Sequence, residues 1–185
     1  MNNKRLRFYF KILFFTLLFF VACGFETSFW PNIITFMPSP QIWLIIMIFL
    51  TLRWSSFFTI FYIYFLGFCL TRFTEVPLKM IWSTTLVMYS SLLFIKNRIQ
   101  LTGAFSFIVL TLFGSIVFEM SYYYFSDLLE AIPTSLMLID RLMQILVNFV
   151  FCYPLYFTLE KLDTLLFDEN EWKHSTKGHH EAHHE

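Results

Sequence analysis

The chain has 185 residues, of which 57% are hydrophobic, 22% aromatic and only 14% charged. This composition excludes an ordinary water-soluble domain, and the apolar segments are too long and continuous for the strands of a membrane barrel. The formal net charge is zero, and no basic cluster interleaved with base-stacking aromatic residues lies outside the apolar segments, so nucleic acid is not an expected partner. We expect an all-α integral membrane protein, because a helix satisfies its own backbone hydrogen bonds within the lipid bilayer.

The first apolar segment, residues 12–24, follows a basic N-terminus. This pattern is typical of a signal peptide and also of a first membrane helix. Residues 20–23 make a poor lipoprotein cleavage box, and more membrane-like sequence follows them. We therefore expect a retained helix.

The second apolar segment, residues 41–52, is short. Its helix would measure about 18 Å, against roughly 30 Å for the hydrocarbon core, so it cannot cross a membrane alone. Either the helix begins earlier, near Ile33, with a break at Pro38 and Pro40, or residues 32–39 form a re-entrant or interfacial segment.

Four further apolar segments cover residues 55–71, 77–95, 103–125 and 135–159, and each is expected to cross with modest tilt. The chain thus predicts a bundle of six transmembrane helices. The breaks between segments are short, so residues 1–165 are expected to form one membrane domain. Residues 166–185 are expected to be a disordered, His-rich cytoplasmic tail.

Basic residues in short loops predict the orientation, because they favour the cytoplasmic side. With a cytoplasmic N-terminus, the inner side holds most of them: Lys4, Arg5, Arg7, Lys11, Arg53, Lys96, Arg98, Lys161, Lys173 and Lys177. The outer side holds Arg72 and Lys79. We expect a multi-pass protein of the bacterial inner membrane with both termini in the cytoplasm.

Ionisable residues inside a membrane segment are costly, so each is a functional candidate. Glu119 and Arg141 both lie about 9 Å inside the outer boundary of their segments, at 1.5 Å per residue. This equal depth predicts an ion pair between the fifth and sixth helices.

The last segment carries a polar stripe, since Arg141, Gln144 and Asn148 share one helix face. Ser115 and Glu119 likewise share one helix face on the preceding segment. The stripe fits a substrate path, contact with a partner helix, or hydrogen bonding within the bundle. Asp140 points about 100° away from Arg141 and is expected to face an outer aqueous cleft or a partner.

No cofactor or resident metal is expected. All five histidines lie in the tail, and the set His179, His180, His183 and His184 gives only a weak metal-binding pattern without a fixed scaffold. The three cysteines sit in or beside apolar segments without metal-binding spacing. No recognisable catalytic motif is present, so we do not expect an enzyme.

The order of segments and loops resembles the MreD family of bacterial rod-shape proteins. The carrying motifs are Trp30-Pro31-Asn32 with Pro38-Ser39-Pro40-Gln41, Leu66-Gly67-Phe68 with Pro77-Leu78-Lys79, Lys96-Asn97-Arg98, and Ile132-Pro133 with Arg141, Asn148 and Pro154. Glu119 also stands where the family commonly has an acidic residue. The sequence departs from the family after the third segment, where residues 70–75 lack its aspartate and glycine-containing turn.

This resemblance implies a non-catalytic scaffold of the cell-elongation complex. Its implied partners are MreC, the RodA and penicillin-binding transpeptidase pair, and indirectly MreB. MreD proteins are similar in fold to the substrate-binding S components of ECF-type vitamin transporters, which supplies the alternative function. S components dock through small residues one turn apart on the first helix, whereas here Leu18 and Glu26 flank Ala22.

Overall fold

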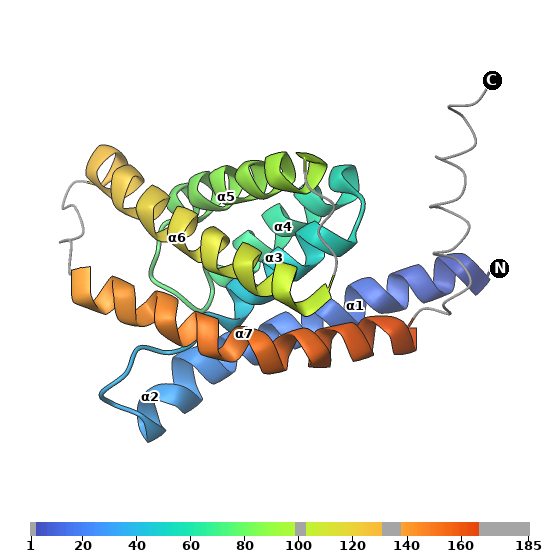
Figure 1. The fold of residues 1–185 in the computed structure, drawn as a ribbon, viewed down its shortest axis with the longest axis horizontal. Coiled ribbons are helices and arrows are strands. Elements are labelled where there is room, and N and C mark those ends of the chain that lie inside the picture. Colours follow the sequence, from blue (N-terminus) through green and yellow to red (C-terminus); the bar gives the residue numbers. More distant parts are fainter. Residues whose placement is uncertain (1–2, 99–102, 131–137, 167–185) are drawn as a thin grey trace.

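A computed structural model describes residues 3–98, 103–130 and 138–166, and within these ranges the regular structure is helical. The elements are α1 (Asn3–Gly24), the π-helix η1 (Phe25–Phe29), α2 (Trp30–Ile33), α3 (Ile42–Arg53), α4 (Ser56–Leu70), α5 (Leu78–Arg98), α6 (Gly103–Leu129) and α7 (Leu138–Leu166). Figure 1 shows them as one bundle. The predicted His-rich tail, with its four candidate metal ligands, lies almost wholly outside the described residues.

The first helical region is longer than predicted. It begins at Asn3 and continues past Gly24 through η1 and α2 to Ile33. Pro31 lies in the first turn of α2, where a missing N–H is tolerated, so the helix continues past it. The chain then becomes extended at Ile34. Of the two alternatives for the second apolar segment, a helix that begins near Ile33 is therefore wrong, since α3 begins at Ile42.

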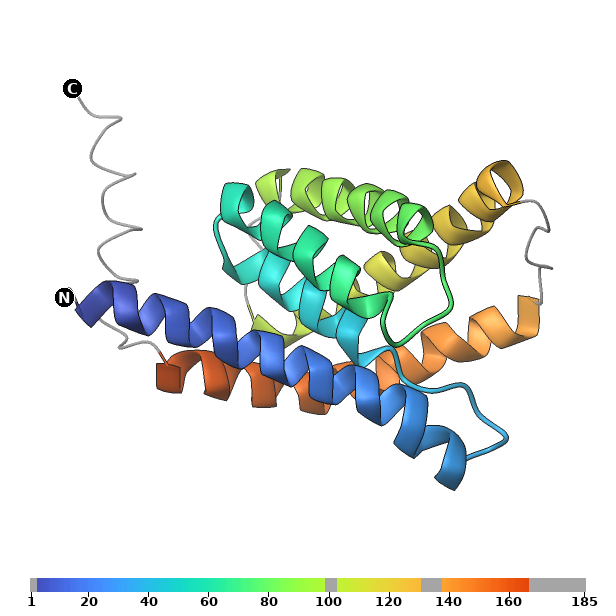
Figure 2. The ribbon, with the colours of Figure 1, turned by 180° about the vertical axis from the view of Figure 1, so that it is seen from behind.

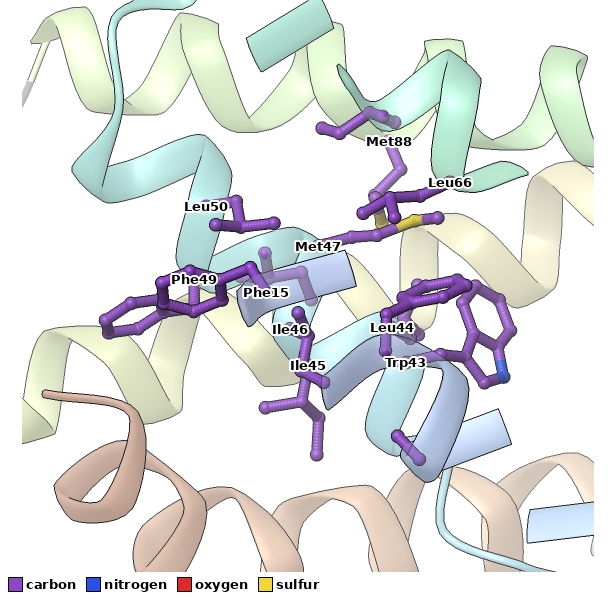
Figure 3. Packing of buried hydrophobic residues seen from close by; sticks show 14 of the residues in the cluster. Phe15, Trp43, Leu44, Ile45, Ile46, Met47, Phe49, Leu50, Leu66 and Met88 are labelled. Atoms are coloured by element: carbon purple, nitrogen blue, oxygen red, sulfur yellow. The ribbon is translucent and has the colours of Figure 1, made fainter. Parts of the chain in front are cut away.

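The short helix α3 forms the centre of the bundle. Every residue from 43 to 51 is buried, because α1, α4, α5, α6 and α7 surround this helix. Figure 3 shows side chains of α3 packed against Phe15 of α1, Leu66 of α4 and Met88 of α5. A helix that is apolar on all sides is stable only when covered on all sides. This explains why a 12-residue segment too short to cross a membrane is nevertheless strongly apolar.

The outer surface of the bundle is also apolar. Leu13, Phe57, Phe105 and Ile139, from four different helices, are each at least 65% exposed. Helices that are apolar both inside and outside the bundle are expected where lipid replaces water.

Among the residues that the structure describes, four helical segments are long and apolar enough to cross a membrane: Phe8–Ile33, Leu78–Lys96, Gly103–Leu129 and Leu138–Leu165. The prediction of six transmembrane helices is thus met in part, because two of the six apolar helices, α3 and α4, are shorter than these candidate spans. Helix α4 has 15 residues, which is about 22 Å of helix.

One end of the bundle gathers basic residues. Lys11 pairs with Asp163 at 2.5 Å, which places the start of α1 beside the end of α7 (Figure 2). Lys96 donates a hydrogen bond to the Thr51 carbonyl at 2.9 Å, which brings the C-terminal ends of α3 and α5 to the same place. We name this the basic end. At the opposite end, Lys79 donates to the carbonyl of Leu129.

Candidate functional site: a polar network at the entry to α3

Residues 34–41 connect α2 to α3 without regular structure, and their last part enters the bundle. Irregular backbone at membrane depth needs hydrogen-bond partners from the protein. Two side chains of α7 provide them. The Gln41 N–H donates to Oδ1 of Asn148 at 2.8 Å, and Nε2 of Gln144 donates to the Ser39 carbonyl at 2.6 Å.

The Gln41 side chain extends the contacts to α6. Its Nε2 donates to Oε1 of Glu119 at 3.1 Å, and its Oε1 accepts from Nδ2 of Asn148 at 2.9 Å. The Asn148 amide also donates to Oγ of Ser115 at 3.3 Å. We name this group the entry network; its members are Ser39, Gln41, Ser115, Glu119, Arg141, Gln144 and Asn148.

The ion pair predicted between α6 and α7 is present. Nη1 of Arg141 lies 2.5 Å from Oε2 of Glu119. The Glu119 side chain is 4% exposed and that of Arg141 is 34% exposed, so the carboxylate is inside the protein and the guanidinium lies at its edge. The Arg141 guanidinium also stands 5.5 Å from the centre of the Tyr122 ring, a cation–π distance. Both carboxylate oxygens of Glu119 are thus engaged.

The other predicted site residues divide into two groups. Gln144 and Asn148 join the network on the same face as Arg141, and Ser115 joins it from α6. Asp140 is exposed and takes no part in the network, in keeping with its predicted direction away from Arg141. It lies in the first turn of α7, where a carboxylate interacts favourably with the helix dipole.

Sequence reasoning missed Gln41 and Ser39 as members. The signal available for Gln41 was its position, because a lone polar side chain at the start of a buried apolar helix needs hydrogen-bond partners inside the protein. Ser39 participates through its backbone carbonyl, for which the side chain gives no signal.

A second set of polar contacts lies at the basic end. Arg53 pairs with Glu160 at 2.5 Å, and the Tyr156 hydroxyl donates to the same carboxylate at 2.9 Å. Together with the pair between Lys11 and Asp163, these contacts join α1 and α3 to the end of α7. The sequence predicts that these basic residues lie on one side of the membrane, but it does not predict their acidic partners.

The entry network holds the start of α3 against α6 and α7. It combines one ion pair with amide and hydroxyl groups that bond to each other and to backbone. The three cysteines are free and buried. Within the described ranges, no group of three or more His, Cys, Asp or Glu side chains is arranged to hold a metal ion.

Four long apolar helices around a buried short helix define a multi-pass membrane protein of all-helical fold. No protein-family model, curated protein or solved structure matches the chain. The MreD resemblance and the S-component alternative therefore stay predictions.

Proposed function

We propose that this chain is a non-catalytic scaffold of the bacterial cell-elongation complex, comparable to MreD. In this proposal it lies in the inner membrane with its basic end and both termini in the cytoplasm. It binds MreC and helps couple MreB to peptidoglycan synthesis by RodA and the penicillin-binding transpeptidase.

The observation that carries the proposal is the internal use of the polar residues. Glu119 bonds to Arg141 and Gln41, and Asn148 bonds to Gln41 and Ser115. A catalytic or transport site needs polar groups that are available to a substrate. Here the groups are occupied in fixing helices to one another, which suits a rigid adaptor.

A scaffold also needs membrane surface that partners can cover, and the long helices offer it. On α7, Leu142, Leu146 and Phe149 are between 48% and 57% exposed and lie on one side of the helix. Association inside a bilayer depends on packing of such faces together with polar contacts.

The alternative, an S component, fits α1 poorly. Ala22 is 5% exposed and belongs to the core, so it is not available to dock a coupling protein. The exposed side of α1 carries bulky residues instead, with Leu13 at 65%, Leu17 at 61% and Val21 at 61% exposure. Close approach of another helix at a small-residue surface is therefore disfavoured on this side.

The test is purification of the tagged full chain from its native membranes in mild detergent, followed by mass spectrometry. An unrelated multi-pass protein with the same tag, expressed at the same level, is the control. We expect specific recovery of MreC with RodA and the transpeptidase. Purified chain and purified MreC, mixed in nanodiscs, should then associate directly.

Two results would overturn the proposal. Recovery of ATPase subunits with a coupling membrane protein would instead identify a transporter component. Recovery of only those proteins that the control also retains, together with failure to bind MreC in nanodiscs, would exclude the elongation scaffold.

A further inference from the structure

The helical region that begins with α1 leaves the core near its end. Ala22 and Cys23 are buried, but none of the residues of η1 or α2 is buried. Figures 1 and 2 both show α2 and the following connection projecting away from the rest of the bundle. We name residues 27–37 the α2 tip.

The α2 tip is too apolar for bulk water. Phe29 is 55% exposed, Ile33 61% and Phe36 81%. The sequence has no charged residue between Glu26 and Arg53 that could solubilise it. An exposed apolar cluster of this kind marks contact with another apolar phase or molecule.

The α2 tip is also too irregular for hydrocarbon. After Ile33 the backbone is extended or bent, so it does not satisfy its own N–H and C=O groups as a helix does. Polar side chains accompany the apolar ones, since Thr27, Ser28 and Asn32 are exposed. Thr27 and Asn32 donate to the backbone carbonyls of Cys23 and Ser28, and the other donors and acceptors of these exposed side chains need water or lipid headgroups.

The length of the first span places the tip between those two environments. The segment Phe8–Ile33 has 26 residues. At 1.5 Å per residue this is about 39 Å, longer than a hydrocarbon core of roughly 30 Å. The span enters the tip directly from the lipid-facing side of α1, where Leu13 and Leu17 are exposed. The tip is thus continuous with the membrane-facing surface.

Trp30 suits the same boundary. Its ring packs against Phe151 of α7 with centroids 5.5 Å apart, and its Nε1 donates to the Met37 carbonyl at 3.3 Å. Tryptophan is enriched at membrane interfaces because it combines an apolar body with a polar N–H.

We propose that the α2 tip is an interfacial anchor, lying in the headgroup and upper acyl region of the leaflet at the opposite end from the basic end. Its occupant is the lipid surface itself. Phe29, Ile33 and Phe36 enter the acyl region, while the backbone of residues 34–37 stays among headgroups. The anchor fixes the depth of α1 and of the connection that enters the bundle at Gln41. This inference depends on the membrane class of the protein and not on its partners.

The test measures the depth of the tip in nanodiscs that contain only this protein. A fluorescent probe is attached to Phe36→Cys, and its quenching by lipids with a nitroxide near the headgroup is compared with quenching by lipids with a mid-chain nitroxide. Leu17→Cys, on the exposed side of the same helical region, is the matched deep control. Wild-type protein gives the labelling background, because Cys23, Cys69 and Cys152 are buried.

We expect the shallow nitroxide to quench the probe at position 36 more strongly than the deep one, and the order to reverse at position 17. Ile33→Cys should behave like Phe36→Cys, which guards against a local effect of one substitution. Quenching of the probe at position 36 by aqueous iodide, but by neither nitroxide lipid, would place the tip in water. That result is expected for a surface that a protein partner covers, and it would overturn the proposal. Stronger quenching at position 36 by the mid-chain nitroxide would also overturn the proposal, because it would place the tip deep among the acyl chains.

Discussion

The two ends of α3 are held by different chemistry. At the N-terminal end, neutral amides carry most of the contacts, as between Asn148 and both the backbone and the side chain of Gln41. At the C-terminal end, the half-buried Lys96 ammonium donates to the carbonyls of Thr51 and Trp54 at 2.9 and 3.2 Å. Both arrangements satisfy groups that a helix leaves free at its ends.

This difference follows from depth and from the helix dipole. The N-terminal end of α3 carries partial positive charge and lies near the Glu119 carboxylate, whereas the C-terminal end carries partial negative charge and meets a cation. The N-terminal end is reached by irregular backbone inside the bundle, which requires partners of fixed geometry. Substitutions at the N-terminal end should therefore destabilise the protein more than those at the C-terminal end.

The largest effect is expected at the ion pair. Arg141→Gln leaves the buried Glu119 carboxylate without its cation, and loss of one partner of a buried pair typically costs 3 to 5 kcal/mol. Because the Arg141 side chain is 34% exposed, we expect the lower part of that range, about 3 kcal/mol. The free energy of unfolding in mixed detergent micelles measures it.

The control for this prediction is the double-mutant cycle with Glu119→Gln. The neutral glutamine keeps a hydrogen-bonding group beside Gln41, so the double variant should be more stable than the sum of the two single losses predicts. Simple additivity would mean that the two charges do not depend on each other in the folded protein.

The next effect concerns Asn148, which is 1% exposed. Asn148→Leu keeps the branching and the number of heavy atoms of the side chain but leaves the Gln41 N–H without its acceptor, and an unsatisfied buried group costs about 2 kcal/mol. Phe149→Leu, at an exposed neighbouring position, should change the free energy of unfolding by less than about 0.5 kcal/mol. Equal losses for the two variants would show that the entry network does not stabilise α3.

A smaller coupling is expected midway along α3, where packing replaces polar contacts. A Cβ atom added at Gly114 would lie 2.8 Å from Cδ1 of Ile48. Ile48→Val removes that methyl group. Gly114→Ala should therefore be more favourable in the Ile48→Val background than in the wild type, by about 1 kcal/mol. An identical effect of Gly114→Ala in both backgrounds would indicate that the contact relaxes without cost.

Composition and apolar run length were sufficient to predict the helices, but not where each one ends. The apolar run stops at Gly24, yet the helical path continues through Glu26, Thr27 and Ser28 as a π-turn. Side-chain polarity marks where lipid contact changes, whereas backbone hydrogen bonding determines where a helix ends. This is why the first helical region was predicted too short and the start of α3 was left with two alternatives.

The ion pair of the candidate site could be predicted from the sequence, but the part of Gln41 in it could not. Equal depth in neighbouring helices is a property of sequence position, so it identified Glu119 with Arg141. The role of Gln41 depends on how the connection from α2 re-enters the bundle. No local sequence pattern predicts that path. The partner of Gln41 on α7, Asn148, lies 107 residues away in the chain.

An effect of similar size to this coupling between Gly114 and Ile48 is expected at the C-terminal end of α3. Lys96→Met keeps the apolar stem of the side chain but removes the donor to Thr51 and Trp54, two carbonyls that the α3 helix and its cap leave free. Loss of this charge at the negative end of the helix dipole should cost about 1 kcal/mol, clearly less than Asn148→Leu. Arg98→Gln is the matched control, because Arg98 ends the same helix and is exposed, with its guanidinium over the Phe94 ring. The same unfolding measurement decides the comparison, since a loss for Lys96→Met as large as that for Asn148→Leu would show that α3 depends equally on both ends.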